Sequence, residues 1–254
     1  MLGLLCRRNL GPYLANYPEL LRFLTSNKNN NMKNNKTHIT VLLDRSGSMG
    51  EIREETIDGF NTFLAHQQQQ PGEATLTLVQ FDDVDPFDVI HRAAPIGQVP
   101  KLNWETYVPR AGTPLLDAIG YGIRSLEKSF ARKPESRRPG KVIVVIITDG
   151  QENSSRRYTK QKVARMIEEK QGEGWQFAFQ SSDMASINDA MDYGIDRHST
   201  LSFDKTRAGT AMAWNSISSA ISSYRQGARE EVSFCDEPVD SPSPASDWNS
   251  LQKN

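Results

Sequence analysis

The chain has 254 residues, and its 30 lysines and arginines nearly balance 31 aspartates and glutamates, which gives a formal net charge of −1. This balance gives no reason at the level of the whole chain to expect a nucleic acid or an acidic membrane as partner, and we expect neither. Basic pairs at residues 132–133, 137–138 and 156–157 are interpreted as solvated charges. The length suits one large α/β domain with tails and leaves little room for two compact domains.

The two ends of the chain differ from its middle. Residues 1–36 contain an Asn- and Lys-rich tract that cannot bury a core, so they are predicted to be a disordered or non-native N-terminal extension. Met32 is an alternative start of the natural protein, and a targeting or docking helix upstream of it stays open. Residues 226–254 are rich in Ser, Pro and Asp and are predicted to be a disordered tail, which leaves residues 37–225 as the domain.

Cysteine content and hydropathy indicate the compartment. Cys6 and Cys235 lie near opposite ends and form no Cys-x-x-Cys motif, so two free thiols in a reducing compartment are expected. The sequence has no run of about 18 apolar residues that could cross a membrane, and no signal-peptide core is evident. We therefore expect a cytoplasmic protein without a membrane span.

From residue 37 onward, strand-like and helix-like patterns alternate, which predicts a parallel sheet between helices. The predicted strands are 38–43, 74–81, 87–93, 141–147, 174–180 and 198–203, and the predicted helices are 52–68, 114–130, 159–171, 184–192 and 206–224. The turn at residues 82–86 is too short for a crossover helix, so the second and third strands should form an antiparallel hairpin. The predicted fold is α/β and doubly wound, with a mostly parallel six-stranded Rossmann-like sheet of order 3-2-1-4-5-6, one antiparallel edge strand and helices on both faces.

A polar turn directly follows the apolar run at residues 39–43. Asp44, Ser46 and Ser48 alternate along this turn, so all three side-chain oxygens can be directed at one point. One carboxylate with two hydroxyl groups suits a hard cation such as Mg²⁺ or Mn²⁺. The turn is therefore predicted to be part of a metal site.

Two further oxygen donors are predicted to lie beside this turn. Thr113 opens a helical pattern, and Asp149 ends the apolar run at residues 142–148. In a sheet of the predicted order, ligands bind beyond the carboxyl ends of the first and fourth strands, where Asp44 and Asp149 stand. The rule for the fold and the motif indicate the same crevice.

These five positions together resemble the metal-ion-dependent adhesion site (MIDAS) of the von Willebrand factor type A (VWA) family, also called the integrin I-domain-like family. The resemblance implies that Ser46, Ser48 and Thr113 bind one Mg²⁺ or Mn²⁺ directly or through water, while Asp44 and Asp149 supply negative charge. It also implies an open coordination position that accepts an Asp or Glu of a protein partner. The alternative is that all five residues only cap helices or turns.

Four neighbouring residues are candidates for a rim that contacts the partner: Arg45, Gln151, Glu152 and Asn153. Their positions next to the predicted ligands suggest this role. The alternative is that they are exposed polar loop residues without a function.

The leading functional hypothesis is a metal-dependent protein-interaction module that is not an enzyme. A metal-dependent hydrolase or phosphatase is one alternative, but phosphatases of the haloacid dehalogenase type need a second acid where Ser46 stands. A serine hydrolase is poorly supported because the turn does not match Gly-x-Ser-x-Gly. A structural protein with a stabilising metal is the other alternative. The partner, the choice between Mg²⁺ and Mn²⁺ and the oligomeric state stay open.

Overall fold

A computed structural model describes residues 36–234 of the chain. The predictions for residues 1–35 and 235–254, and for both cysteines, lie outside the described residues.

All the predicted strands and helices between residues 37 and 225 are present. The strands are β1 (Lys36–Asp44), β2 (Glu73–Phe81), β3 (Asp88–Pro95), β4 (Lys141–Thr148), β5 (Gln176–Ser181) and β6 (Thr200–Ser202). The α-helices are α3 (Arg53–Gln68), α4 (Leu115–Ala131), α5 (Lys160–Gly172), α6 (Met184–Asp192) and α7 (Arg207–Gln226). Short 3-10 helices are η1 (Gly47–Ile52), η2 (Ile96–Gln98), η3 (Glu135–Arg137) and η4 (Arg197–Ser199). None of the described helices is both long and apolar enough to span a bilayer.

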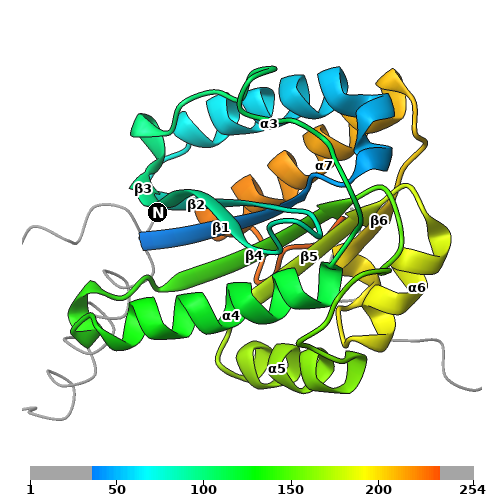
Figure 1. Cartoon of the computed structure of the whole chain (residues 1–254). Coiled ribbons are helices and arrows are strands. Elements are labelled where there is room, and N and C mark those ends of the chain that lie inside the picture. The colour runs from blue at the N-terminus through cyan, green and yellow to red at the C-terminus, as the bar shows by residue number, and fades with distance from the viewer. Residues whose placement is uncertain (1–35, 235–254) are drawn as a thin grey trace, which may run out of the picture.

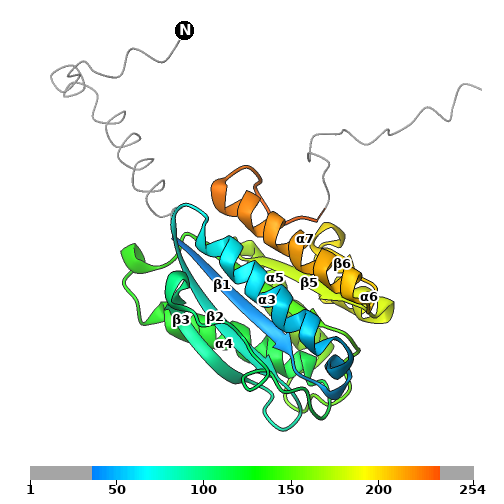
Figure 2. The same ribbon diagram turned by 90° about the horizontal axis from the view of Figure 1, so that it is seen from above.

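The sheet has the predicted order β3-β2-β1-β4-β5-β6. Strand β3 runs antiparallel to β2, and the other neighbouring strands are parallel. Helices α3 and α7 lie side by side on one face, and α4, α5 and α6 cover the other face (Figures 1 and 2). This arrangement confirms the predicted fold class.

The central strands β1 and β4 are buried on both faces, which explains their continuous apolar sequences. Successive side chains of a strand point to opposite faces, so β1 contributes to both cores. Val41 and Leu43 pack beneath α3 and α7, whereas Leu42 packs beneath α4 and α5. Both carboxyl ends are therefore held rigidly between two hydrophobic layers.

Helices α3 and α7 approach each other closely at a glycine. A Cβ atom on Gly59 would lie 2.0 Å from the Trp214 side chain, so only glycine fits at that position. Phe60 packs edge-on against the same indole, with a centroid distance of 6.1 Å. This contact fixes α7 against the sheet.

The two edges of the sheet are irregular or short. Strand β3 shifts register against β2 around Leu76 and Leu78, and Ala93 has a positive φ of 46°. Pro95 ends β3, and β6 at the other edge has only 3 residues.

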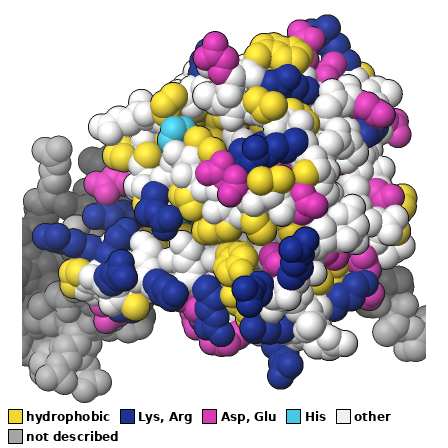
Figure 3. Space-filling model, in the orientation of Figure 1, with side chains coloured by type: hydrophobic (Ala, Val, Ile, Leu, Met, Phe, Trp, Pro, Cys, Tyr) yellow, Lys and Arg dark blue, Asp and Glu magenta, His cyan; other side chains and the backbone are white. Residues whose placement is uncertain are grey.

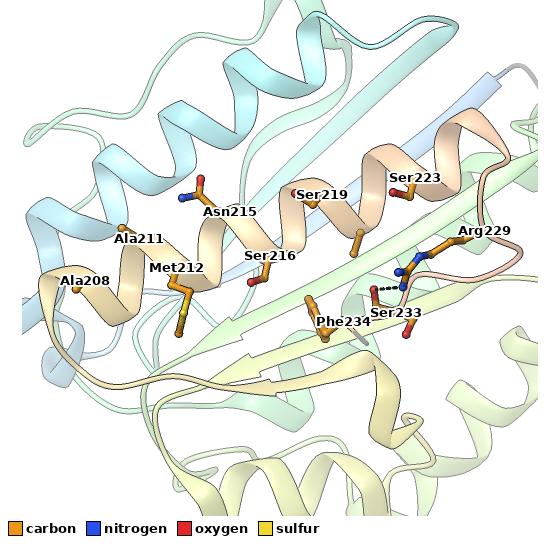
Figure 4. Close-up of a pocket in the computed structure, with 11 residues that line it drawn as sticks. Ala208, Ala211, Met212, Asn215, Ser216, Ser219, Ser223, Arg229, Ser233 and Phe234 are labelled. Atoms are coloured by element: carbon orange, nitrogen blue, oxygen red, sulfur yellow. Dashed lines mark hydrogen bonds between the residues drawn. The ribbon is translucent and has the colours of Figure 1, made fainter. Parts of the chain in front are cut away.

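The folded domain continues beyond the boundary predicted at residue 225. Helix α7 ends at Gln226, and the chain then turns back so that Val232 is fully buried. The Phe234 amide donates to the His198 carbonyl at 2.8 Å. A groove with a volume of about 520 Å³ separates this returning segment from α7, and Arg229 and Phe234 line its far side (Figure 4). The prediction of a tail starting at residue 226 is therefore wrong for residues up to 234.

The imidazole of His38 is buried within the sheet. Its ring nitrogens lie 2.8 Å from Thr75 Oγ1 and 3.1 Å from Thr40 Oγ1, and the residue is 1% exposed. Burial, with a smaller contribution from the charge of Lys133, lowers the pKa of His38 to about 3. The folded state thus keeps this histidine neutral under mildly acidic conditions.

Because His38 is buried in its neutral form, the protein becomes less stable as the pH decreases. Below pH 6.5 His38 is protonated in the unfolded chain but stays neutral in the folded chain. It should therefore reduce the free energy of unfolding by up to about 1.4 kcal/mol for each unit by which the pH decreases. We expect the His38→Gln variant to be less stable than wild type at pH 7.5 but to lose less stability on going to pH 5. Urea denaturation at both pH values tests this, and equal losses in the two proteins would contradict it.

Candidate functional site

The candidate site lies where the carboxyl ends of β1 and β4 meet. Asp44 is the last residue of β1, and Asp149 directly follows β4. The two strands are paired in parallel, with Leu43 opposite Ile147, so both aspartates emerge at the same edge of the sheet. This is the point at which the strand order reverses, as the sequence predicted.

Hydrogen bonds connect four of the five predicted ligands. The Ser46 amide donates to Asp44 Oδ1 at 2.6 Å, and the hydroxyl oxygens of Ser46 and Ser48 lie 3.2 Å apart. The Ser48 hydroxyl donates to Asp149 Oδ1 at 2.7 Å. Ser48 is exposed, whereas Asp44, Ser46 and Asp149 are buried. The cluster is therefore closed beneath and opens to the surface at Ser48.

Among the described residues, the fifth predicted ligand, Thr113, forms no hydrogen bond to the other four, and hydrogen bonds connect only its loop to theirs. The Gly47 amide donates to the Ala111 carbonyl at 3.0 Å, and the Thr113 amide donates to Asn153 Oδ1 at 2.8 Å. Thr113 is 3% exposed. A Cβ on Gly112 would lie 3.0 Å from Asn153 Oδ1, so glycine permits the close approach of the two loops. The loop before α4 is thus fixed against the loops that follow β1 and β4.

The Asp44 carboxylate is buried, and its hydrogen-bond donors are uncharged groups. Burial raises the pKa of Asp44 to about 7, and the nearby Asp149 charge adds to that rise. Hydrogen bonds from the Thr148 hydroxyl, at 2.6 Å, and from the Ser46 amide oppose the rise without cancelling it. The Tyr107 hydroxyl holds the Asp44 carbonyl at 2.7 Å. A cation placed beside this carboxylate would favour its ionised form.

Lys205, in the loop between β6 and α7, also belongs to the site. Its ammonium nitrogen lies 2.8 Å from Asp149 Oδ2 and 2.9 Å from Glu51 Oε2. Burial disfavours the charged ammonium, but hydrogen bonds to Asp149 and Glu51 outweigh it and raise the pKa of Lys205. The Asp149 side chain is fully buried, so this ion pair compensates its charge. Sequence reasoning missed Lys205 because it is remote from the motif.

Arg45 is not a rim residue, which corrects the prediction. It is 7% exposed, and its guanidinium donates to Asp82 Oδ2 at 2.7 Å and to Asp88 Oδ2 at 2.9 Å. It also donates to Gln80 Oε1 at 3.2 Å, and Arg110 shares Asp82 at 2.9 Å. Arg45 therefore ties the turn after β1 to the β2–β3 hairpin and points away from the site.

Glu152 also has a structural role. Its carboxylate accepts hydrogen bonds from the amides of Ser154 at 2.9 Å and Ser155 at 2.7 Å, and from the Leu116 amide at 2.9 Å. The last of these bonds satisfies a donor in the first turn of α4. Glu152 thus holds its own loop and the start of α4 in place.

Of the four rim candidates, Gln151 and Asn153 are exposed. Gln151 donates to Asp183 Oδ2 at 3.3 Å, and Asn153 holds Thr113 as described above. The exposed side chains of Trp104 and Val108 lie in the loop before α4, and Trp104 stacks on the Arg53 guanidinium at 4.4 Å. The sequence patterns that predict strands and helices do not extend to this loop, so they did not identify these two residues.

The carboxylate of Asp117, to which the sequence analysis gave no role, stabilises the loop that follows β4. Asp117 is 2% exposed and accepts hydrogen bonds from three successive amides, those of Arg156 at 2.9 Å, Arg157 at 2.9 Å and Tyr158 at 2.8 Å. It lies in the first turn of α4 and thereby fixes the loop that carries Asp149.

Replacing Asp117 by Asn should loosen this loop. An amide offers one acceptor oxygen and turns an NH₂ group toward backbone donors, which should cost about 1–3 kcal/mol in the free energy of unfolding. Hydrogen exchange of residues 156–158 should become faster. Asp192→Asn, a matched change at an exposed position, serves as control. Unchanged exchange and unchanged urea stability in Asp117→Asn would contradict this role.

The donor set of the site fits a hard cation. Within residues 36–234 no three carboxylate, imidazole or thiol groups are clustered so that they could hold a metal without other ligands. A cation at this site would therefore depend on the hydroxyl groups of Ser46, Ser48 and Thr113 in addition to the two aspartates. Oxygen donors of this kind suit Mg²⁺ or Mn²⁺ and are poor ligands for softer metals.

Similarity to known proteins is found in structure and not in sequence. No protein-family model and no curated protein matches the sequence. Among solved structures, the pilus adhesin SpaC from Lactobacillus rhamnosus GG is similar with a TM-score of 0.55 and 12% identity. Proximal thread matrix protein 1 from the mussel byssus, described with a zinc-occupied MIDAS motif, is similar with a TM-score of 0.50 and 10% identity. A von Willebrand factor type A protein from Catenulispora acidiphila has a TM-score of 0.49 and 15% identity.

These matches cover 73–74% of the present chain but only 30–46% of the solved chains. The chain therefore spans less than half the length of these similar proteins. At such low identity the similarity shows the fold, which is of the VWA type.

Proposed function

We propose that the chain is a protein-interaction module that uses one divalent cation, Mg²⁺ or Mn²⁺, to bind an Asp or Glu of a partner protein. The observation that carries this proposal is the chain of hydrogen bonds from Asp44 through Ser46 and Ser48 to Asp149. These groups converge at the strand ends around a buried carboxylate that lacks compensating charge. The MIDAS motif named for the similar mussel protein supports the same assignment.

In this proposal, Asp44, Ser46, Ser48, Thr113 and Asp149 hold the cation. The ion would act as a Lewis acid for a carboxylate that approaches from the surface side of Ser48. The two exposed rim candidates, Gln151 and Asn153, would then contact the partner, together with Trp104 and Val108. Tryptophan is among the side chains that most often supply the binding energy of protein interfaces.

We expect no enzymatic activity. The position two residues after Asp44 is a serine, which cannot serve as a general acid or base near neutral pH. The serine hydroxyls of the cluster bond to one another and to Asp149, and none of their hydrogen bonds among the described residues is to a histidine.

A threonine substitution tests the metal site. Mg²⁺ or Mn²⁺ at about 100 times its Kd should stabilise wild type by about 2.7 kcal/mol, because the ion binds only the folded state. Thr113→Ala should weaken Mn²⁺ binding about tenfold or more, whereas Thr62→Ala, at an exposed position of α3, should leave it unchanged. Calorimetric titration with Mn²⁺ measures the affinities of both variants.

The capture of a partner from host lysate is a second test. Capture should be lost in EDTA and in Thr113→Ala, and capture that persists in both would contradict the proposal.

Lys205 should compete with the metal for Asp149. Its ammonium already occupies Oδ2 of this carboxylate and would repel a divalent ion nearby. Lys205→Gln should therefore tighten Mn²⁺ binding by about tenfold, which corresponds to about 1.4 kcal/mol. Lys101→Gln makes the same chemical change at an exposed position away from the site and should have no effect. Weaker binding in Lys205→Gln would show that the lysine supports the metal site.

A further inference from the structure

The charge of the chain is unevenly distributed over the fold. Residues 115–173, which form α4, β4 and α5, contain 13 lysines and arginines and 8 aspartates and glutamates, a net charge of +5. Residues 36–114 contain 6 and 11 of these residues, a net charge of −5. The near-neutral total therefore conceals one basic face.

Seven exposed basic side chains on α4, on α5 and in the loop before α5 form this face, which we call the α4–α5 basic face. They are Arg124, Lys128, Arg132, Arg156, Arg157, Lys162 and Arg165. Figure 3 shows Lys and Arg side chains gathered over α4 and α5 in the lower half of the molecule. Two of the three basic pairs interpreted as solvated charges, at residues 132–133 and 156–157, thus contribute to one surface.

The two helices present these side chains next to each other. Arg124 of α4 and Lys170 of α5 share Glu127, at 2.8 Å and 2.9 Å. The Lys162 ammonium lies 4.4 Å from the centre of the Tyr158 ring, which packs edge-on against Tyr121 of α4 at 5.2 Å. These contacts hold α4 and α5 against each other, so the exposed basic residues of the two helices lie on neighbouring elements.

The face is long enough to follow a polymer. Arg124 and Lys128 of α4 and Arg132, the C-cap residue of this helix, are spaced four residues apart on one side, which places them about 6 Å apart along the axis. Asp117 anchors the loop with Arg156 and Arg157 at the N-terminal end of the same helix. Since α4 has 17 residues, the face extends over roughly 25 Å.

Most of these basic groups form no ion pair within residues 36–234. Apart from Arg124, the residues of the face form no ion pair with a carboxylate of residues 36–234. Exposed carboxylates on α5 are confined to its C-terminal half, at Glu168 and Glu169. Unpaired like charges gathered on one surface repel one another, and a polyanion would relieve that repulsion.

The positions of the exposed apolar side chains indicate which kind of polyanion fits the basic face. The large hydrophobic side chains that are exposed within residues 36–234 are Val84, Trp104, Val108, Met184 and Met212. None of them lies on α4 or α5. Peripheral membrane binding usually adds inserted apolar side chains, and protein interfaces usually have an apolar centre. Binding to a phosphate backbone needs neither, because Lys and Arg supply most of its affinity.

We propose that the α4–α5 basic face binds the phosphate backbone of a nucleic acid. Arginine, which provides five of the seven basic residues, can donate two parallel hydrogen bonds to one phosphate. The binding is independent of base sequence, because no described feature of the face is suited to reading base edges. It is also independent of the proposed metal site, which lies at the strand ends.

Fluorescence anisotropy of the full chain with a labelled DNA duplex of about 30 bp tests this proposal, in EDTA so that the metal site has no influence. Wild type should bind, and log K should fall with log[NaCl] with a slope of about −3 or steeper. Lys128→Glu/Lys162→Glu should weaken binding about 50-fold at about 0.1 M NaCl and reduce the slope by about two. Lys101→Glu/Arg197→Glu makes the same change in net charge at exposed positions outside the face and should change affinity less than about threefold.

Several results would overturn the proposal: absence of saturable binding by wild type at about 50 mM NaCl, equal weakening by the two double variants, or preferential binding to vesicles containing phosphatidylserine. An RNA duplex and single-stranded DNA in parallel titrations distinguish the form of nucleic acid. Circular dichroism checks that the variants fold, and Lys128→Gln/Lys162→Gln, which removes charge without adding any, should give an intermediate loss of affinity.

Discussion

The burial of the Asp44 carboxylate at the end of β1 is the constraint on which the rest of the candidate site depends. A fully buried carboxylate is costly unless hydrogen bonds or a positive charge compensate it. The surrounding chain supplies the Ser46 amide and the Thr148 hydroxyl, but the pKa of Asp44 still rises to about 7. The fold maintains this arrangement because β1 is fixed between β2 and β4 and between two hydrophobic layers. A destabilising charge at a rigid position is a common feature of binding sites.

The neighbouring Asp149 is compensated in a different way. Lys205 reaches it from the loop between β6 and α7 and also contacts Glu51. The site therefore contains one carboxylate with an internal cation and one without. This difference between the two aspartates depends on Lys205, which is not one of the five motif residues.

The sequence was sufficient to predict the order of the strands and the meeting of Asp44 and Asp149 at the strand ends, because both depend on local patterns. The apolar runs before Asp44 and Asp149 end at the positions where β1 and β4 end, and the strand order then brings these residues together. Side-chain directions could not be predicted in the same way. Arg45 follows Asp44 directly, yet it turns toward Asp82 and Asp88, which are near only in the folded chain.

The same limit applies to the boundary of the domain and to the basic residues. The segment after α7 has a composition typical of a tail, but Val232 finds a place in the core that only the folded chain provides. Basic pairs that are separated in sequence lie on one surface because α4 and α5 are neighbours. Whole-chain charge averages over such a surface and conceals it.

The form of the two sheet edges limits how this molecule can associate with other chains. Long, regular edge strands expose a row of unpaired amides and carbonyls that can recruit a further strand. Here β3 is distorted by register shifts, a positive φ at Ala93 and a proline at its end, and β6 has only 3 residues. Neither edge is a good template for β-augmentation or for amyloid-like stacking. Within residues 36–234, recognition of a partner by strand addition is therefore disfavoured at both edges of the sheet.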